Sequence, residues 1–256
     1  ESFLILFGIF LIISIYEFCN LVQVNKTIPL ISGTSIYVLI ILISNYYNLK
    51  AEDIQLLDIV LLAITLLISI KCVVFLFDNS LQKISNSSKY IYLLGYITLP
   101  FIFITKISFG IKNYNPKIII GLLILIWTND TFAYIVGKSI GKHKLFEKIS
   151  PKKTIEGFFG GLIFAIFAGY LISMYLIKPS TQFSDKSILI WMIIAAIVGV
   201  MGTIGDLIES KFKRIAGVKD SGKIMPGHGG VLDRLDSVIF VAPFIFLFYK
   251  ILYYVS

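Results

Sequence analysis

Charged side chains gather in one stretch of the chain, residues 205–236, which reads GDLIESKFKRIAGVKDSGKIMPGHGGVLDRLD. It holds five carboxylates, namely Asp206, Glu209, Asp220, Asp233 and Asp236. Five lysines and arginines precede its Pro-Gly turn, namely Lys211, Lys213, Arg214, Lys219 and Lys223. Oxygen ligands without a histidine or cysteine cluster favour magnesium or manganese over zinc, and lysine and arginine neutralise phosphates. The stretch therefore predicts a site where a hard divalent cation meets phosphate groups.

The carboxylates have the spacing of helix faces. A helix that continues past residue 210 would place Asp206, Glu209 and Ser210 on one face, because residues three and four apart are neighbours on a helix. A second helix that begins near residue 232 would likewise place Asp233 and Asp236 on one face. Magnesium uses only one or two carboxylates and completes its shell with water and substrate phosphates. A nucleotide is therefore an expected co-ligand.

The basic, glycine-rich middle of the stretch has the composition of a phosphate-binding segment. Counter-charges for phosphates are available from Lys213, Arg214, Lys219 and Lys223. The turn at 226–230 carries little side-chain bulk, so backbone can approach a ligand closely, and we expect His228 within it to contact a phosphate. Positive-inside anchoring explains a basic run, and a salt-bridged helix start explains Asp233–Asp236. Neither explains five carboxylates and a glycine turn together.

Two upstream segments also carry polar groups at membrane boundaries. Asp130 lies in an otherwise apolar run, where a carboxylate binds a cation, pairs with a base, faces water or serves as a neutralised packing residue. In SPKKTIEG (150–157), Ser150 fits a helix N-cap followed by proline at the first helical position. With Lys152 and Lys153, that helix start would form an anion site, although a basic membrane anchor explains the octapeptide equally well.

The elements that must position these residues are membrane-spanning helices. Of the 256 residues 57% are hydrophobic and 15% charged, and the mean hydropathy is +0.88. A soluble domain has roughly 25% charged residues and lacks apolar runs of about eighteen or more. The chain is therefore predicted to be an all-α, polytopic membrane helical bundle of about eight spans. We expect them roughly at 3–18, 28–44, 55–77, 90–109, 116–137, 155–177, 187–208 and 235–255.

The distribution of basic residues predicts the orientation. Alternate connections carry fifteen of the lysines and arginines, the opposite set carries six, and the richer set is expected in the cytoplasm. The 138–154 and 209–234 connections then share a face and can cooperate. The net charge of +8 is interpreted as topology and affinity for anionic lipid rather than nucleic-acid binding. Cys19 and Cys72 are expected to be buried free thiols.

The sequence resembles the phosphatidate cytidylyltransferases (CDP-diacylglycerol synthases). The resemblance rests on the run S-x-F-K-R-x4-K-D-x-G-x2-M-P-x-H-G-G-V-x-D-R-L-D at 210–236, and on the blocks at 130–137 and 150–157. It covers about residues 115–256, so the C-terminal half, 116–256, would carry the signature and 1–115 the other helices of one membrane-embedded unit. Family members usually have a further span at the start, and Glu1 in place of a methionine leads us to expect a longer chain upstream.

The resemblance implies transfer of a cytidylyl group from CTP to phosphatidate, with release of pyrophosphate. It implies Mg²⁺, with a monovalent cation as a candidate second ion, and a catalytic site on the cytoplasmic side of a bacterial plasma membrane. A homodimer is expected from the resemblance alone. Of the candidate site residues, the metal ligands are predicted to be Asp206, Asp233 and Asp236, with Asp220 in reserve. The contacts to CTP or lipid phosphate are predicted to be Asp130, Lys152, Lys153, Ser210, Lys213, Arg214, Lys219, Lys223, His228, Gly229, Gly230 and Arg234.

Three other functions fit parts of the sequence. A relative acting with CTP on another lipid phosphate or on a polyprenol could share the nucleotide site. His228 and Asp233 have the H-x4-D spacing of glycerolipid acyltransferases, which leaves the basic run unexplained. Asp130 and Asp206 inside spans would suit a cation transporter. Acceptor specificity, acyl-CoA consumption and CTP turnover without an ion gradient distinguish these alternatives.

Overall fold

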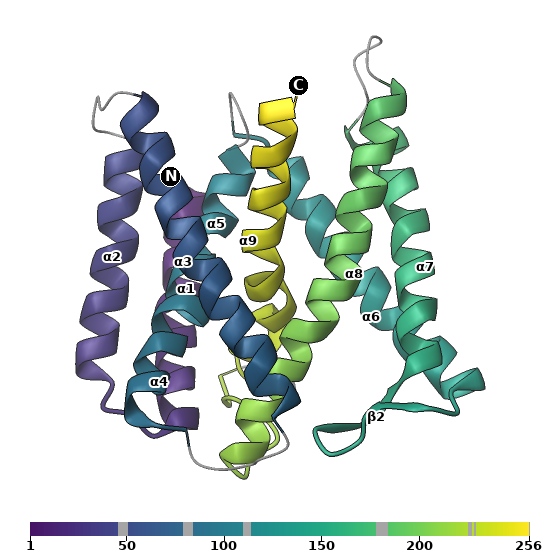
Figure 1. Cartoon of the computed structure of the whole chain (residues 1–256), viewed down its shortest axis with the longest axis horizontal. Coiled ribbons are helices and arrows are strands. Elements are labelled where there is room, and N and C mark those ends of the chain that lie inside the picture. The colour runs from purple at the N-terminus through teal and green to yellow at the C-terminus, as the bar shows by residue number, and fades with distance from the viewer. Residues whose placement is uncertain are drawn as a thin grey trace.

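The computed structural model describes residues 1–45, 51–78, 84–109, 114–177, 184–224, 227 and 229–255, and it is mostly helical (Figure 1). Its elements are α1 (Ser2–Val22), α2 (Thr27–Asn45), α3 (Ala51–Phe77), α4 (Asn86–Tyr92), the π-helical η1 (Leu93–Thr98), α5 (Leu99–Phe109), α6 (Pro116–Ile140), β1 (Lys144–Phe146), β2 (Ser150–Thr154), α7 (Ile155–Leu171), the π-helical η2 (Ile172–Ile177), α8 (Ser184–Ile215) and α9 (Leu232–Val255).

The eight predicted spans are confirmed. Within the described ranges, eight helical segments are long and apolar enough to cross a bilayer, with α4, η1 and α5 forming one of them. The span of α8 continues to Ile215 rather than ending near 208, and that of α9 starts at Leu232 rather than 235. Both extensions lie at one end of the bundle, and they put Glu209 and Asp233 on regular helix, while Asp220 lies in the connection between α8 and α9.

One span forms the centre of the bundle. In its most apolar window, 83% of the span Asn86–Ser108 is buried, against 22–50% for the others. Its Tyr96 ring lies 6.2 Å from that of Phe18 on α1 and 5.7 Å from that of Phe212 on α8. Phe212 also stacks on Phe75 of α3, with ring centroids 4.8 Å apart. This aromatic cluster fixes the end of α8 that carries the charged residues, because four elements converge on it.

Helices α6, α7 and α8 pack closely through small residues. A Cβ on Gly157 of α7 would lie 2.6 Å from the Ala133 carbonyl oxygen of α6, and one on Gly161 would lie 2.6 Å from that of Asn129. Further along α7, a Cβ on Gly169 would lie 2.7 Å from the Trp191 carbonyl oxygen of α8. Glycine spacing of this kind lets membrane helices approach until their backbones touch. The polar ends of the three helices are thereby held together.

A two-stranded antiparallel hairpin, β1–β2, connects α6 to α7. The predicted helix start at Ser150 is wrong, because Ser150–Thr154 is a strand and α7 begins at Ile155. Thr154 caps α7 instead, its hydroxyl accepting a hydrogen bond from the Gly157 amide at 3.1 Å. Pairing with β1 satisfies backbone groups that a helix would have used, and proline is tolerated on such an edge strand. The hairpin and the α8–α9 connection lie at the same end of the bundle, at the bottom of Figure 1.

Candidate active site

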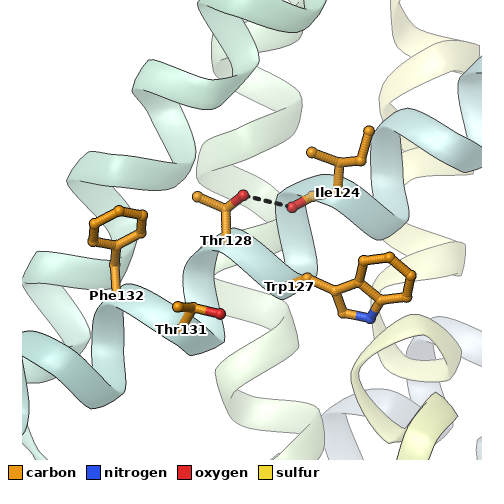
Figure 2. Close-up of a pocket in the computed structure, with 5 residues that line it drawn as sticks. All are labelled: Ile124, Trp127, Thr128, Thr131 and Phe132. Atoms are coloured by element: carbon orange, nitrogen blue, oxygen red, sulfur yellow. Dashed lines mark hydrogen bonds between the residues drawn. The ribbon is translucent and has the colours of Figure 1, made fainter.

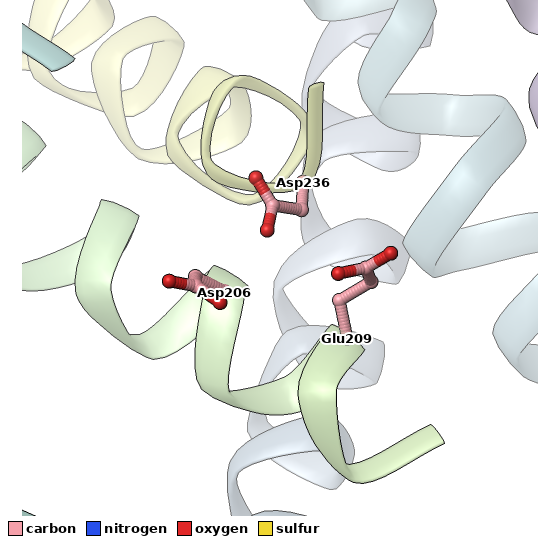
Figure 3. Close-up of side chains that lie close together, drawn as sticks. All are labelled: Asp206, Glu209 and Asp236. Atoms are coloured by element: carbon pink, nitrogen blue, oxygen red, sulfur yellow. The ribbon is translucent and has the colours of Figure 1, made fainter. Parts of the chain in front are cut away.

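Three carboxylates converge where α8 meets α9. Asp206 and Glu209 extend from α8 and Asp236 from α9, and Figure 3 shows them pointing toward one another. One oxygen atom from each lies within 4.8 Å of the other two. Glu209 has no exposed surface and Asp236 has 8%, while the Asp206 side chain retains 31%. The cluster is thus buried on one side and open at Asp206.

The residues present fit a hard cation. In the part of the chain that the structure describes, Glu209 Oε1 is buried and accepts no hydrogen bond. A buried carboxylate oxygen without a partner is costly, and such groups in native proteins have a structural or functional reason. Carboxylate oxygens are the donors that Mg²⁺ takes. We therefore assign Asp206, Glu209 and Asp236 as the residues able to hold one.

Two lysines balance part of the negative charge. Lys153, from the end of β2, forms an ion pair with Asp206. Lys213, on α8, pairs with Glu209 at 2.5 Å and with Asp233 at 2.7 Å. Four carboxylates therefore share two ammonium groups, and the excess at full ionisation is two negative charges. Asp130, within electrostatic range of Lys153 and Asp206, adds a further negative charge, and a divalent cation would offset most of this excess.

Asp233 lies outside this cluster, although we predicted it as a metal ligand. Its Oδ2 accepts hydrogen bonds from the Ser221 amide (2.9 Å), the Ser221 hydroxyl (2.9 Å) and the Gly230 amide (2.7 Å), and its Oδ1 pairs with Lys213. A Cβ on Gly229, which has φ +85°, would lie 2.7 Å from Oδ2. Asp233 therefore holds the two ends of the glycine-rich loop against the start of α9.

A second carboxylate holds the same loop, and we did not predict it from the sequence. Glu17 of α1 is 1% exposed, and it accepts hydrogen bonds from the Val231 amide (3.2 Å) and the Leu232 amide (2.8 Å). The Ser221 hydroxyl also donates to it at 3.4 Å. The only signal in the sequence is an acidic residue inside an apolar span, which is expensive unless something pairs with it.

The structure brings several other predicted residues to the cluster. The Ser210 hydroxyl donates to Asp206 at 3.2 Å. Asp130 of α6 lies within electrostatic range of Lys153 and Asp206. Arg214 lies farther out and donates to the Ile149 and Val218 carbonyls, at 3.2 Å each, which ties the end of α8 to the hairpin.

Other predicted residues lie at the surface or outside the described ranges. Four lysine and aspartate side chains are exposed, without an ion pair to another described residue, namely Lys152, Lys219, Asp220 and Lys223. Arg234 is also exposed. Their predicted contacts to substrate phosphates remain predictions. His228, for which we expected a phosphate contact, lies outside the described residues.

A shallow depression of about 240 Å³ lies along α6 (Figure 2). Its lining consists of Ile124, Trp127, Thr128, Thr131 and Phe132. The Thr128 hydroxyl donates back to the Ile124 carbonyl at 2.7 Å, as Figure 2 shows, and Phe132 stacks on Phe164 of α7 with ring centroids 3.8 Å apart. With the Thr128 hydroxyl satisfied within its own helix and Trp127 64% exposed, this mostly apolar face is suited to hydrocarbon. It belongs to the helix that carries Asp130.

Comparison with known proteins identifies the family of this chain. The phosphatidate cytidylyltransferase of Bacillus subtilis (strain 168) is 34% identical over 229 residues, 86% of this chain and 78% of that protein. The enzyme of the same name from Staphylococcus epidermidis is 44% identical over 52% of this chain, and the one from Staphylococcus aureus 41% over 59%. Those two alignments span about half of each staphylococcal protein, 48% and 54%. The pattern of the cytidylyltransferase family matches residues 1–252, and the chain belongs to that family.

Proposed function

We propose that this protein transfers the cytidylyl group of CTP to phosphatidate, giving CDP-diacylglycerol and pyrophosphate. It is a multi-span membrane nucleotidyltransferase of phospholipid synthesis, as its family and its relatives' names imply. The observation that carries the proposal is the cluster of Asp206, Glu209 and Asp236, flanked by Lys153 and Lys213. Carboxylates for a metal and ammonium groups for phosphates are the parts that phosphoryl-type transfer requires.

The chemical obstacle in this reaction is electrostatic. A phosphate monoester has a second pKa of roughly 6, so the attacking oxygen of phosphatidate is ionised near neutrality and needs no strong base. That oxygen bonds to the α-phosphorus of CTP, and the bond from the α-phosphorus to the bridging oxygen breaks, releasing pyrophosphate. Both reactants are anions, and their mutual repulsion must be screened before they meet.

The charged residues of the site can provide that screening. A magnesium ion held by Asp206, Glu209 and Asp236 would neutralise the triphosphate and the departing pyrophosphate. Lys153 belongs to the half-exposed side of the cluster and can exchange its partner Asp206 for a phosphate oxygen. Lys213, 11% exposed, instead keeps Glu209 and Asp233 in place. A monovalent cation beside the magnesium stays a prediction.

The lipid substrate is proposed to reach the site from the bilayer, along α6. The depression lined by Trp127 and its neighbours faces outward on the same helix as Asp130, so acyl chains lying there would bring a headgroup toward Lys153. The positive-inside count supports a cytoplasmic position for this end of the bundle, where CTP is available. For a bacterial protein the membrane would be the plasma membrane. A homodimer remains a prediction.

The deciding experiment supplies purified protein with labelled CTP, phosphatidate and Mg²⁺. We expect label in the lipid phase and one pyrophosphate released per lipid formed, both dependent on the metal. Parallel reactions with another lipid phosphate and with a polyprenol test the acceptor. Preference for either of these, or CTP hydrolysis without lipid labelling, would overturn the proposal.

A further inference from the structure

Glu17 is a buried carboxylate in a membrane helix, and it contacts a distant part of the chain. It lies in α1, and its hydrogen-bond donors among the described residues lie more than 200 residues further along the chain: the Val231 and Leu232 amides and the Ser221 hydroxyl, which it shares with Asp233. In the described ranges no lysine or arginine forms an ion pair with it. Its compensation comes from backbone amides at the start of α9, where a helix carries partial positive charge.

The glycines of the loop leave the space that this carboxylate occupies. A Cβ on Gly222 would overlap the Glu17 carboxylate, and one on Gly230 would lie 2.5 Å from Glu17 Oε1. Neither glycine has a positive φ, so backbone conformation does not require glycine at these positions. Their lack of a side chain is explained by the close approach of Glu17. Helix α1 and the loop are therefore built to fit each other.

Glu17 and Asp233 hold the loop together, through a shared partner. The Ser221 hydroxyl lies 2.9 Å from Asp233 Oδ2 and 3.4 Å from Glu17 Oε2. Both carboxylates also accept amides from the segment that leads into α9, Gly230 for Asp233 and Val231 and Leu232 for Glu17. The position at which α9 begins is thus set from two sides. Asp236 follows Leu232 by one helical turn.

We propose that Glu17 is a positioning residue for the transfer reaction. It fixes the start of α9, and through it the approach of Asp236 to Asp206 and Glu209, and it holds the described ends of the loop, Ser221–Gly222 and Gly230–Leu232, against α1. Glu17 touches no reacting group and acts only through these elements. The proposal deepens the proposed function and rests on it for the catalytic consequence, but the effect on the loop does not depend on any activity.

The test compares Glu17→Gln with Ser14→Ala. The first keeps the size of the side chain but replaces one acceptor oxygen with an NH₂ group that faces donor amides. Ser14 lies on the same helix, is equally buried, and its hydroxyl has no hydrogen-bond partner among the described residues. Gly222→Ala disturbs the same contact from the side of the loop, because its methyl group would overlap the Glu17 carboxylate, and it leaves the sequence of α1 unchanged. Each variant is purified as the full chain in detergent.

Two measurements are made on each variant. Tryptic cleavage after Lys219 and Lys223, without substrate, reports how firmly the loop is held, because cleavage requires local opening. We expect Glu17→Gln and Gly222→Ala to be cleaved at least about tenfold faster than wild type, and Ser14→Ala at the wild-type rate. Turnover should fall by about tenfold or more in kcat, with the KM for CTP changed by less than about threefold, since the loss is in alignment rather than in binding. Thermal unfolding should change no more than for Ser14→Ala.

Unchanged cleavage in Glu17→Gln would overturn the proposal, as would a variant that unfolds globally with the loss of turnover. Faster cleavage with wild-type kcat would overturn the catalytic part, because the loop would then be held for another reason. If wild-type protein forms no CDP-lipid at all, the proposed function fails. The cleavage comparison would then still decide whether Glu17 holds the loop.

Discussion

Asp233 and Asp236 are three positions apart on α9, yet their carboxylates have different surroundings. Asp233 is saturated by two amides, a hydroxyl and Lys213. Asp236 accepts the Ser237 amide at 2.6 Å and otherwise faces Asp206 and Glu209. A metal bound at Asp233 would have to displace several hydrogen bonds, whereas one at Asp236 would relieve repulsion between carboxylates. At this scale, position on a helix face does not determine the role of a residue.

The Mg²⁺ requirement of variants can distinguish the role of Asp236 from that of Asp233. We expect Asp236→Asn to reduce lipid formation by at least about a hundredfold, since a lost ligand costs several kcal/mol of transition-state stabilisation. The Mg²⁺ concentration for half-maximal rate should rise as well. Asp233→Asn should also reduce the rate but leave the Mg²⁺ requirement near that of wild type. A shift in that requirement for Asp233→Asn alone would restore it as a ligand, as we predicted from the sequence.

The ion pair between Lys153 and Asp206 can be tested by substitution, with the adjacent Lys152 as the control. Lys153→Met removes the cation next to Asp206, and we expect the rate at low CTP to fall by about tenfold or more, with partial recovery in Lys153→Arg. Lys152 is exposed and forms no ion pair with another described residue, and Lys152→Met should lower the rate clearly less than Lys153→Met does. Steady-state rates at several CTP and phosphatidate concentrations provide the comparison. Equal losses in the two methionine variants would mean that general surface charge, not this ion pair, matters.

Sequence reasoning put Asp206 and Glu209 on one helix face and Asp233 and Asp236 on another, because helical spacing makes such faces predictable. The spacing alone does not show which of these four carboxylates converge, because that depends on how α9 packs against α8. Glu17 could not be assigned, because its partners are backbone amides far along the chain and side-chain pattern does not reveal them. The hydrogen bonds of Asp233 to the loop could not be predicted for the same reason.

At the scale of elements, α7 is positioned by its glycines and the hairpin before it. Glu156 accepts the amides of Lys142 and His143 at 3.1–3.2 Å and the His143 ring at 2.6 Å, which closes the hairpin onto the start of α7. Lys153 extends from that hairpin to Asp206. The sequence predicted a helix there because Ser-Pro is a common helix start, but the pairing of β2 with β1 delays the helix to Ile155, where Thr154 caps it.

The α6–α7 contact predicts a stability effect. Gly161→Ala places a methyl group 2.6 Å from the Asn129 carbonyl oxygen, and such overpacking costs about 1–3 kcal/mol. For a chain of this size each kcal/mol lowers Tm by roughly 2–4 °C. Gly202→Ala on α8 is the control, because its nearest neighbour would be 3.6 Å away. Thermal unfolding of both in the same detergent checks this, and an unshifted Tm for Gly161→Ala would show that the helices can separate without cost.

At the scale of the whole molecule, the orientation in the membrane can be measured. Lys148 lies in the hairpin and Lys117 at the start of α6, and both are exposed. The native thiols of Cys19 and Cys72 are buried, so they give little background. We expect Lys148→Cys to react with a membrane-impermeant maleimide only from the cytoplasmic side, and Lys117→Cys only from the other. Labelling of both from one side would contradict the predicted topology.

Composition predicted the spans well, because length and hydropathy are local properties of the chain. The order in which the spans pack is not local. The span Asn86–Ser108 lies at the centre, and α1 contacts the loop that precedes α9. Both arrangements follow from shape matching among helices that are all apolar. The predicted division at residue 115 describes the sequence signature and leaves out this contact.

The contact between Glu17 and the start of α9 has a consequence for biosynthesis. A ribosome adds roughly 5–20 residues per second, so more than ten seconds separate the emergence of Glu17 from that of Leu232, 215 residues later. Throughout that interval an acidic side chain in a newly inserted helix lacks the amides that will receive it. Arrival of α9 supplies them and assembles the carboxylate cluster in the same step. A chain interrupted before that point would therefore have neither a settled α1 nor a functional site.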